Sequence, residues 1–289
     1  MFQIIGIVVL FTMVFGSFLL SGGRLDVITH ALPHEMMAIG GAGIAAFLIS
    51  NSMATIKATG TGFKKIFAGP KWKASDYSDL LSLLFLLTKT MKSKGVIALE
   101  SHIENPEQST IFSRFPRVLK DHFAVDFICD TLRMMTMNLE DPHQVEDAME
   151  KQLEKHHHEA LAPANALQSL ADALPALGIV AAVLGVIKTM GSITEPPEVL
   201  GAMIGGALVG TFLGVFLAYG LVGPMGARLR NVVEEEHSFY RIIQSVLVAH
   251  LHGNAAQISV EIGRGNVPSP AQPSFLELEE ALSSIPAEG

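Results

Sequence analysis

Four long stretches of this sequence carry almost no charged side chain: 1–20, 36–53, 174–187 and 199–222. Backbone polar groups cannot remain unpaired in lipid, so apolar runs of about 18 or more residues predict helices that span a membrane. About 120 charge-rich residues separate the second run from the third. The sequence therefore predicts an integral membrane protein with two helical hairpins and a large domain on one side.

The predicted fold class is all-α, because almost no strand-like alternation of apolar and polar residues is present. We expect four transmembrane helices, a helical cytoplasmic domain between the second and the third, and a C-terminal cytoplasmic helix and tail. Their predicted bounds, in chain order, are 1–21, 34–53, 54–170, 171–190, 199–223 and 224–289.

Local signals divide the polar regions further. Glycine and lysine in 54–75 indicate a connector, and a short apolar core in 76–94 indicates a buried helix. Further helices are predicted for 115–139 and 142–170, and another for the residues between Pro224 and His252. Four prolines near the C-terminus indicate a loosely ordered tail, in which 275–280 is a candidate for a short docked helix.

The distribution of lysine and arginine predicts the orientation. Of the 20 such residues, 14 lie between residues 57 and 155, and four follow the last apolar run. Only Arg24 and Lys188 fall on the other side. The large loop and both termini are therefore expected in the cytoplasm. The first apolar run lacks the basic region that precedes a cleaved signal, so it is expected to remain as a helix.

Composition and motifs exclude several functions. The net charge of −8 disfavours a nucleic-acid partner. Cys129 is the single cysteine, so no internal disulfide can form. The consecutive His156, His157 and His158 would point in different directions on a helix, so no metal site is predicted. No nucleophile elbow, P-loop or GxGxxG motif is present, so neither an enzyme nor a cofactor is expected.

Small residues repeat every four positions along the fourth span, at Ala202, Gly206, Gly210, Gly214 and Ala218. Such a ridge lets another helix approach closely. It could pack against the third span of the same chain, or in a tight ring of several subunits, and both can hold together.

The third span also presents a face of small residues. This face could accept a partner helix or line a narrow path, and its members are Pro175, Gly178, Ala182, Gly185 and Thr189. Pro175 either frees a carbonyl one turn earlier and marks a hinge, or simply marks the start of a helix.

Ionisable groups are missing from the apolar runs. Glu35 lies at the outer edge of the second, and the fourth offers only Thr211 and Tyr219. A bundle that moves protons usually needs an ionisable group within the membrane. If this chain belongs to an ion pathway, we therefore expect a partner to supply the carboxylate. Taken alone, the Thr211 hydroxyl is expected to bond to a carbonyl one turn earlier.

Four stretches together carry a family resemblance: PANAL with ADALPALGIVAAVLG in 163–185, VGTFLG with AYG in 209–220, LESHIENP in 99–106, and PSFLELE in 273–279. They resemble MotA flagellar motor stator subunits of the MotA/TolQ/ExbB proton channel family, over essentially the whole chain. The resemblance implies a ring of five chains around two MotB helices in the inner membrane. MotB would supply the missing aspartate, and ion flow would drive torque on the rotor protein FliG.

The resemblance also implies roles for single residues. Pro175 and Pro224 match the two prolines at the inner ends of the third and fourth spans. Glu100 matches a rotor-facing glutamate, and Lys92 stands where the family has arginine, which keeps the charge but loses the bidentate fork. Thr211, Ala182 and Tyr219 would then belong to the ion pathway.

The type of ion follows from one position. Sodium-driven relatives have threonine seven residues after the proline of the third span, and Ala182 stands there in this chain, so protons are expected. Two other functions remain open on the sequence. One is an ExbB- or TolQ-like proton channel that energises the outer membrane, although those relatives have three spans. The other is a non-conducting membrane scaffold.

Overall fold

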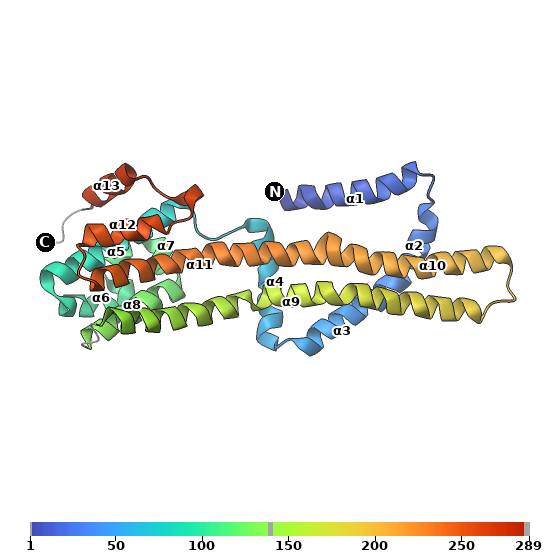
Figure 1. Cartoon of the computed structure of the whole chain (residues 1–289), viewed down its shortest axis with the longest axis horizontal. Coiled ribbons are helices and arrows are strands. Elements are labelled where there is room, and N and C mark those ends of the chain that lie inside the picture. Colours follow the sequence, from blue (N-terminus) through green and yellow to red (C-terminus); the bar gives the residue numbers. More distant parts are fainter. Residues whose placement is uncertain (1, 138–140, 286–289) are drawn as a thin grey trace. The chain divides into compact units, whose positions relative to one another are not determined.

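The computed structural model describes residues 2–137 and 141–285. Predictions that fall on Met1, on 138–140 and on 286–289 lie outside these residues. Every regular element in the described part of the chain is a helix (Figure 1), which confirms the predicted all-α class. Within these described ranges, four helices are long and apolar enough to cross a membrane: Phe2–Leu20, Leu25–Ser50, Pro142–Met190 and Pro197–Leu251. These features fit a multi-pass membrane protein.

The chain divides into two compact units. The first, called the membrane unit below, comprises Met1–Gly69 and Leu161–Val232. The second, called the helical unit, comprises Pro70–Ala160 and Val233–Gly289. The helical unit thus contains most of the charge-rich sequence between the second and third apolar runs.

The first two spans form the start of the membrane unit. Helix α1 extends over Phe2–Leu20 and ends at a turn in which Gly22 has a φ of +86°. The second span consists of α2 (Leu25–Glu35), a π-helical segment (Met36–Gly40) and α3 (Gly41–Ser50). It therefore begins well before Pro33, where the sequence predicted its start. Pro33 lies inside α2, because an internal proline removes only one backbone hydrogen bond and α2 packs along the fourth span.

The predicted connector after the second span is largely a helix. Helix α4 extends over Met53–Ala68, and the Ser52 hydroxyl caps it by accepting a hydrogen bond from the Thr55 N–H at 3.2 Å. A Cβ atom added at Gly62 would meet a Leu229 methyl group at 2.9 Å. Glycine in this segment thus serves close helix packing, which a composition-based prediction of a connector cannot detect.

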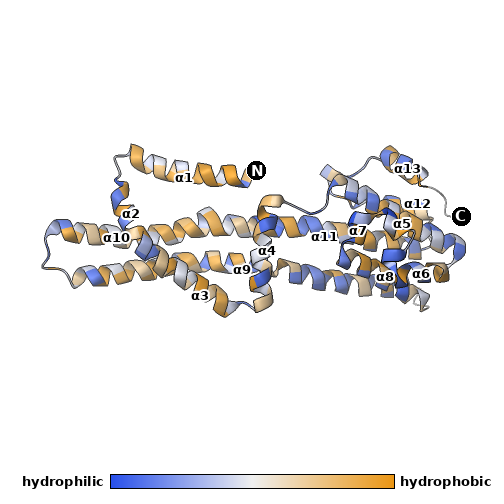
Figure 2. Ribbon diagram, turned by 180° about the vertical axis from the view of Figure 1, so that it is seen from behind, coloured by the Kyte–Doolittle hydropathy of each residue, from blue (hydrophilic) through white to orange (hydrophobic). Residues whose placement is uncertain are grey.

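The third and fourth spans belong to long helices that continue past the predicted boundaries. Helix α9 extends over Pro142–Met190 without interruption at Pro163 or Pro175. The other long helix comprises α10 (Pro197–Val215), a π-helical segment (Phe216–Val222) and α11 (Gly223–Leu251). Pro175 therefore does not start a helix, and that alternative was wrong. Figure 2 shows hydrophobic residues along α1, α3 and α10, and a mixture of polar and hydrophobic residues in α11.

The helical unit is built around α5 (Ala74–Lys94), whose predicted burial is confirmed by fully buried Leu80, Leu84 and Leu87. Trp72 stacks on Phe239 at 3.8 Å between ring centroids. Parts of α9 and α11 also belong to this unit. Its further α-helices are α6 (Glu100–Glu104), α7 (Pro116–Leu119), α8 (His122–Thr136), α12 (Ala256–Gly265) and α13 (Phe275–Ser283). Short 3-10 segments occur at Val96–Leu99, Pro106–Gln108, Phe112–Arg114 and Ser269–Ala271.

Helix α13 confirms the short docked helix predicted within the tail. The Ser274 hydroxyl accepts a hydrogen bond from the Glu277 N–H at 3.2 Å, and the Glu277 carboxylate accepts one from the Ser274 N–H at 2.7 Å. Leu278 and Leu282 are buried. This part of the tail is therefore ordered by a capping box and by apolar contacts, not loosely arranged as its prolines suggested.

Two buried carboxylates tie the helical unit together. Asp76, only 1% exposed, accepts a hydrogen bond from the Lys73 N–H at 2.8 Å and forms a bidentate pair with Arg117 at 2.5 and 2.9 Å. Asp121 caps α8 and also pairs with Lys71 at 2.5 Å and with the Tyr240 hydroxyl at 3.1 Å. Each negative charge is thus matched by a cation or by donated hydrogen bonds, as burial requires.

Candidate ion pathway

Helices α9 and α10 touch through their backbones. A Cβ atom added at Gly178 would meet the Gly210 carbonyl oxygen at 2.9 Å and the Gly214 Cα at 3.1 Å. One added at Gly185 would meet the Ala207 Cβ at 2.6 Å. Glycine is therefore needed at these positions of the hairpin, and van der Waals contact between backbones replaces side-chain packing.

The ridge of small residues on α10 is shared between two neighbouring helices. The nearest atom to a Cβ at Gly206 would be the Ala31 Cβ of α2, at 3.9 Å. At Gly214 the nearest atom would be the Leu174 carbonyl oxygen of α9, at 2.7 Å. Gly210 faces both helices, because Ala181 of α9 lies at 3.3 Å from its Cβ position and Glu35 of α2 lies closer still. Part of the ridge thus packs against other helices of the same chain.

Glu35 lies deeper in the fold than the sequence suggested. Its Oε2 would lie 2.6 Å from a Cβ atom at Gly210, which is at the middle of the charge-free run 199–222. The Glu35 side chain is half-buried, and its Oε2 is inaccessible and has no hydrogen-bond partner within the described residues. The prediction that Glu35 stays at the outer edge of its span was therefore wrong, because α2 begins before Pro33 and carries Glu35 alongside α10.

An open groove adjoins Glu35. It has a volume of about 630 Å³ and is lined by α2, the end of α9 and the start of α10. Most of its lining is apolar or small. Its ionisable side chains are Asp26, His30, His34, Glu35 and Lys188.

Thr211 follows Gly210 on α10, and Ala182 follows Ala181 on α9. The Thr211 hydroxyl makes no hydrogen bond to any described residue, whereas the Thr189 hydroxyl donates to the Gly185 carbonyl at 2.9 Å. The bond predicted for Thr211 to a carbonyl one turn earlier is thus absent from the described part of the chain. Its hydroxyl is available to a ligand.

Tyr219 lies in different surroundings. It is 67% exposed and lines a cavity of about 310 Å³ together with residues of α1, α4 and the start of α11, among them Gln3, Phe67 and Pro224. Pro224 is the second residue of α11, which directly follows the π-helical segment of the fourth span. The structure therefore groups Tyr219 with Pro224 and places Thr211 elsewhere, two turns earlier on the same helix.

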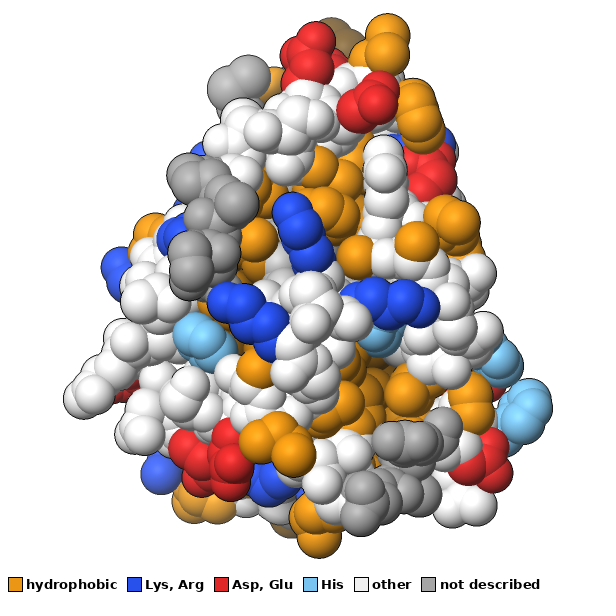
Figure 3. Space-filling view, turned by 90° about the vertical axis from the view of Figure 1, so that its left-hand side faces the viewer, with side chains coloured by type: hydrophobic (Ala, Val, Ile, Leu, Met, Phe, Trp, Pro, Cys, Tyr) orange, Lys and Arg blue, Asp and Glu red, His pale blue; other side chains and the backbone are white. Residues whose placement is uncertain are grey.

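The two predicted rotor-facing charges flank one turn of the helical unit. Lys92 lies in the last turn of α5, and its Nζ donates to the Gly253 carbonyl at 3.4 Å. Glu100 starts α6, after a turn in which Gly95 has a φ of +82°. Both side chains are exposed, and both signs complement the helix dipoles. Figure 3 shows Lys and Arg side chains in the middle of one end of the molecule and Asp and Glu side chains toward its rim.

Histidines of the helical unit lie in distinct environments. His156 stacks on Phe123 at 3.6 Å between ring centroids, while His157 lies 4.1 Å from His237. Burial, followed by the positive potential of His157 and Arg241, lowers the pKa of His237 to about 4. Burial, followed by the Lys92 cation, also lowers the pKa of His250.

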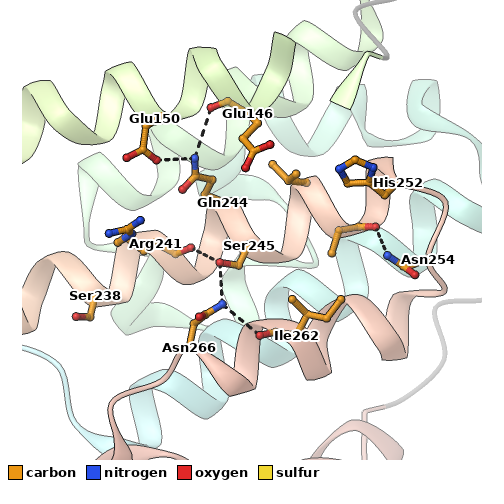
Figure 4. Close-up of a pocket in the computed structure, with 12 residues that line it drawn as sticks. Glu146, Glu150, Ser238, Arg241, Gln244, Ser245, His252, Asn254, Ile262 and Asn266 are labelled. Atoms are coloured by element: carbon orange, nitrogen blue, oxygen red, sulfur yellow. Dashed lines mark hydrogen bonds between the residues drawn. The ribbon is translucent and has the colours of Figure 1, made fainter. Parts of the chain in front are cut away.

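A second groove, of about 650 Å³, is lined by α9, α11 and α12 of the helical unit (Figure 4). Its polar groups largely bond to one another. The Gln244 amide donates to the Glu150 carboxylate at 2.9 Å, and the Asn266 amide donates to the Ser245 hydroxyl at 3.0 Å. These bonds join helices across the groove and give it a structural role.

Known proteins resemble this chain over nearly its whole length. The family profile described as "Motility protein A N-terminal" matches residues 4–95, and the one described as "MotA/TolQ/ExbB proton channel family" matches 120–241. Motility protein A of Salmonella typhimurium is 40% identical over 99% of this chain and 96% of its own length. Chemotaxis protein LafT of Vibrio parahaemolyticus is 33% identical over 97% and 98%, respectively.

Solved structures agree with this likeness at the level of the fold. The structure of C. jejuni MotAB superposes with a TM-score of 0.72 at 20% identity, over 94% of this chain and 98% of that chain. The flagellar MotAB stator complex from Bacillus subtilis also gives a TM-score of 0.72, at 22% identity, over 96% and 100%. With its four apolar helices and its full-length relatives, this chain belongs to the motility protein A family, within the MotA/TolQ/ExbB proton channel family.

Proposed function

We propose that this chain is the ring-forming subunit of a flagellar motor stator, which conducts protons together with MotB and converts their flow into torque on the rotor. The observation that carries this proposal is the free Thr211 hydroxyl beside the glycine-lined contact of α9 and α10, in a chain of the motility protein A family. A smooth helix surface next to an unused hydroxyl suits a partner helix that carries a proton-binding group.

The partner is MotB, named in the complexes of the two similar structures. Its membrane helix supplies an aspartate near Thr211, and five copies of this chain surround two such helices. The exposed apolar side chains of α1 support an assembly in lipid, because no residue of α1 is buried within the chain. Neighbouring subunits and lipid then cover this surface.

Protons drive the motion by changing the charge of the MotB aspartate. Protonation removes the charge and alters how the MotB helix rests against Ala182 and Thr211. One charge crossing the membrane supplies about 2.3 kcal/mol per 100 mV, enough to bias a packed interface but not to unfold one. Pro175 and Pro224 provide bending points, because each removes one backbone hydrogen bond within a long helix.

The helical unit transmits this motion. Lys92 and Glu100 act on charges of the rotor protein FliG from the cytoplasmic side. The large loop and both termini are cytoplasmic, since 18 of the 20 lysines and arginines lie in these parts of the chain. The membrane is the inner one.

Ala182 and Thr211 also bear on which ion the stator conducts. With alanine at position 182, Thr211 provides a single hydroxyl, which favours protons over a coordinated sodium ion. Rotation is therefore expected to follow the proton gradient. Speed that tracked external sodium at a fixed proton gradient would show that the ion is sodium.

The deciding experiment uses cells that lack this chain but still assemble flagella. We expect filaments that do not turn, and rotation restored by re-expression. Normal swimming in a strain without any other stator would overturn the proposal, and defects in energised outer-membrane uptake would then point to the ExbB- or TolQ-like function.

A further inference from the structure

Glu35 places a carboxyl group within the membrane unit with one oxygen buried and the other side facing a groove. Its Oε2 lies against the backbone of Gly210 without a hydrogen-bond partner within the described residues. The same side chain also lines the open groove between α2, α9 and α10. Glu35 is therefore in contact with both the helix that carries Thr211 and the space outside the helices.

A charged carboxylate is costly in this position. An unpaired charge in a membrane interior loses its hydration, so it is retained where it binds protons or ions. Protonation of Glu35 would remove this cost. The charged form is stable only while water or a cation occupies the groove. The surroundings of Glu35 thus suit a group that alternates between the two states.

The groove provides a series of ionisable groups that leads to Glu35. Asp26, His30 and His34 recur every four residues on α2 and therefore share one face of the helix. Imidazole groups exchange protons near neutral pH, which suits relay positions. Lys188 is the ionisable residue that α9 contributes to the lining, and the residues from α10 are apolar or small.

The backbone around Glu35 departs from a regular α-helix on both sides. Pro33 cannot donate to the carbonyl one turn earlier, and the π-helical segment Met36–Gly40 begins directly after Glu35. Single π-turns within α-helices occur frequently at functional sites, because they redirect side chains and free backbone carbonyls. Here the two departures bracket the carboxyl group.

We propose that Glu35 is a second proton-binding carboxyl group of the stator, loaded from outside through the groove lined by Asp26, His30, His34 and Lys188. A hydrated proton or an imidazolium of the groove transfers its proton to the Glu35 carboxylate, forming the neutral acid. The O–H bond of this acid breaks when the proton passes on to the carboxylate of MotB, and Glu35 returns to its charged form. This inference rests on the proposed stator function and adds an outer stage to its proton route.

The first test measures proton uptake by vesicles that contain the full chain with MotB. Glu35→Gln keeps the shape of the side chain but cannot bind a proton, and we expect it to abolish uptake while MotB still copurifies. Glu35→Asp keeps the carboxyl group and is expected to retain part of the uptake. The matched control is Glu195→Gln, at an exposed position of the connection between α9 and α10. We expect this variant to take up protons at the wild-type rate.

Uptake by Glu35→Gln at the wild-type rate would overturn the inference and leave the stator function intact. Absence of uptake by the wild-type complex itself would count against the proposed stator function instead.

A second measurement does not depend on conduction. Infrared difference spectra of the complex, recorded as the pH is lowered, are expected to contain the carbonyl band of a protonated carboxylic acid that Glu35→Gln lacks and Glu195→Gln retains. An identical band in both variants would show that Glu35 does not take up the proton and only fills the space beside Gly210.

Discussion

The interiors of the two units of this protein are packed in opposite ways. In the membrane unit, Gly178 and Gly214 bring two helix backbones into direct contact, and large apolar side chains face outward. In the helical unit, large residues such as Trp72 and Phe239 face inward, and buried carboxylates such as Asp76 are paired. Lipid removes the hydrophobic drive for large side chains to turn inward, so close contact through small residues replaces it.

The largest effect is expected from enlarging a glycine of the membrane unit, where two helix backbones are in contact. Gly214→Val would place a side chain against the Leu174 carbonyl oxygen and the Gly178 Cα, so the backbones must separate. We expect loss of assembly with MotB and of rotation, since overpacking costs about 1–3 kcal/mol even where side chains can yield. Copurification and swimming assays measure both.

Gly201→Val is the matched control on the same helix, because nothing lies within 4 Å of its Cβ position. It is expected to assemble and to support rotation. Equal defects in both variants would show that any bulky residue in α10 is harmful and that the contact with α9 is not special.

The corresponding test in the helical unit removes one member of a buried pair. Arg117→Met would leave the Asp76 carboxylate, 1% exposed, without its cation. We expect the free energy of unfolding of this unit to fall by about 2–3 kcal/mol. Trp72 is the single tryptophan of the sequence and lies in this core, so its fluorescence reports the unfolding of this unit.

Arg133→Met provides the control for Arg117. Arg133 pairs with Glu104 and Asp130 at the surface, where such ion pairs contribute about 1 kcal/mol or less. A loss as large as that of Arg117→Met would contradict the importance assigned to burial.

A smaller effect is expected at Thr211 of the membrane unit, whose hydroxyl is assigned to the ion pathway and not to helix packing. Thr211→Ala removes a hydroxyl that bonds to no described residue, so stability should be unchanged while torque falls. Thr211→Ser keeps the hydroxyl and is expected to restore most of the torque. Measurements of the speed of tethered cells compare the two, and normal speed of Thr211→Ala would remove Thr211 from the pathway.

The smallest effect at neutral pH concerns histidine titration in the helical unit. The pKa of His237 is lowered to about 4 in the folded state, whereas the pKa of an unfolded histidine is about 6.5. The unfolded state therefore binds more protons between these values, so this contribution to stability is complete above pH ~6.5 and is lost as the pH falls toward ~4. His250 contributes in the same direction.

His237→Gln should reduce this loss of stability without abolishing it. Unfolding followed by Trp72 fluorescence at several pH values measures the slope. Identical slopes for the wild type and the variant would contradict the assignment to His237.

Much of the architecture could be predicted because the solvent imposes it. A bilayer demands long apolar helices, and cytoplasmic loops collect lysine and arginine, so the four spans are visible in the sequence. The short helix at 275–280 and the apolar core of α5 are equally local, and both were predicted from the sequence, although the capping box of α13 was not. The family resemblance also predicts roles for Thr211, Lys92 and Glu100, and these roles stay predictions.

Composition and periodicity along single helices were thus sufficient to predict the all-α class, the number of apolar spans and the ridges of small residues. Three features depend instead on contacts between helices that are distant in the chain: α2 begins before Pro33, α9 continues through Pro175, and Glu35 lies against Gly210. Proline and glutamate are unfavourable in a span considered alone. Whether a span tolerates them depends on the surface of the neighbouring helix. That helix comes from a distant part of the chain, so no local sequence pattern reveals it.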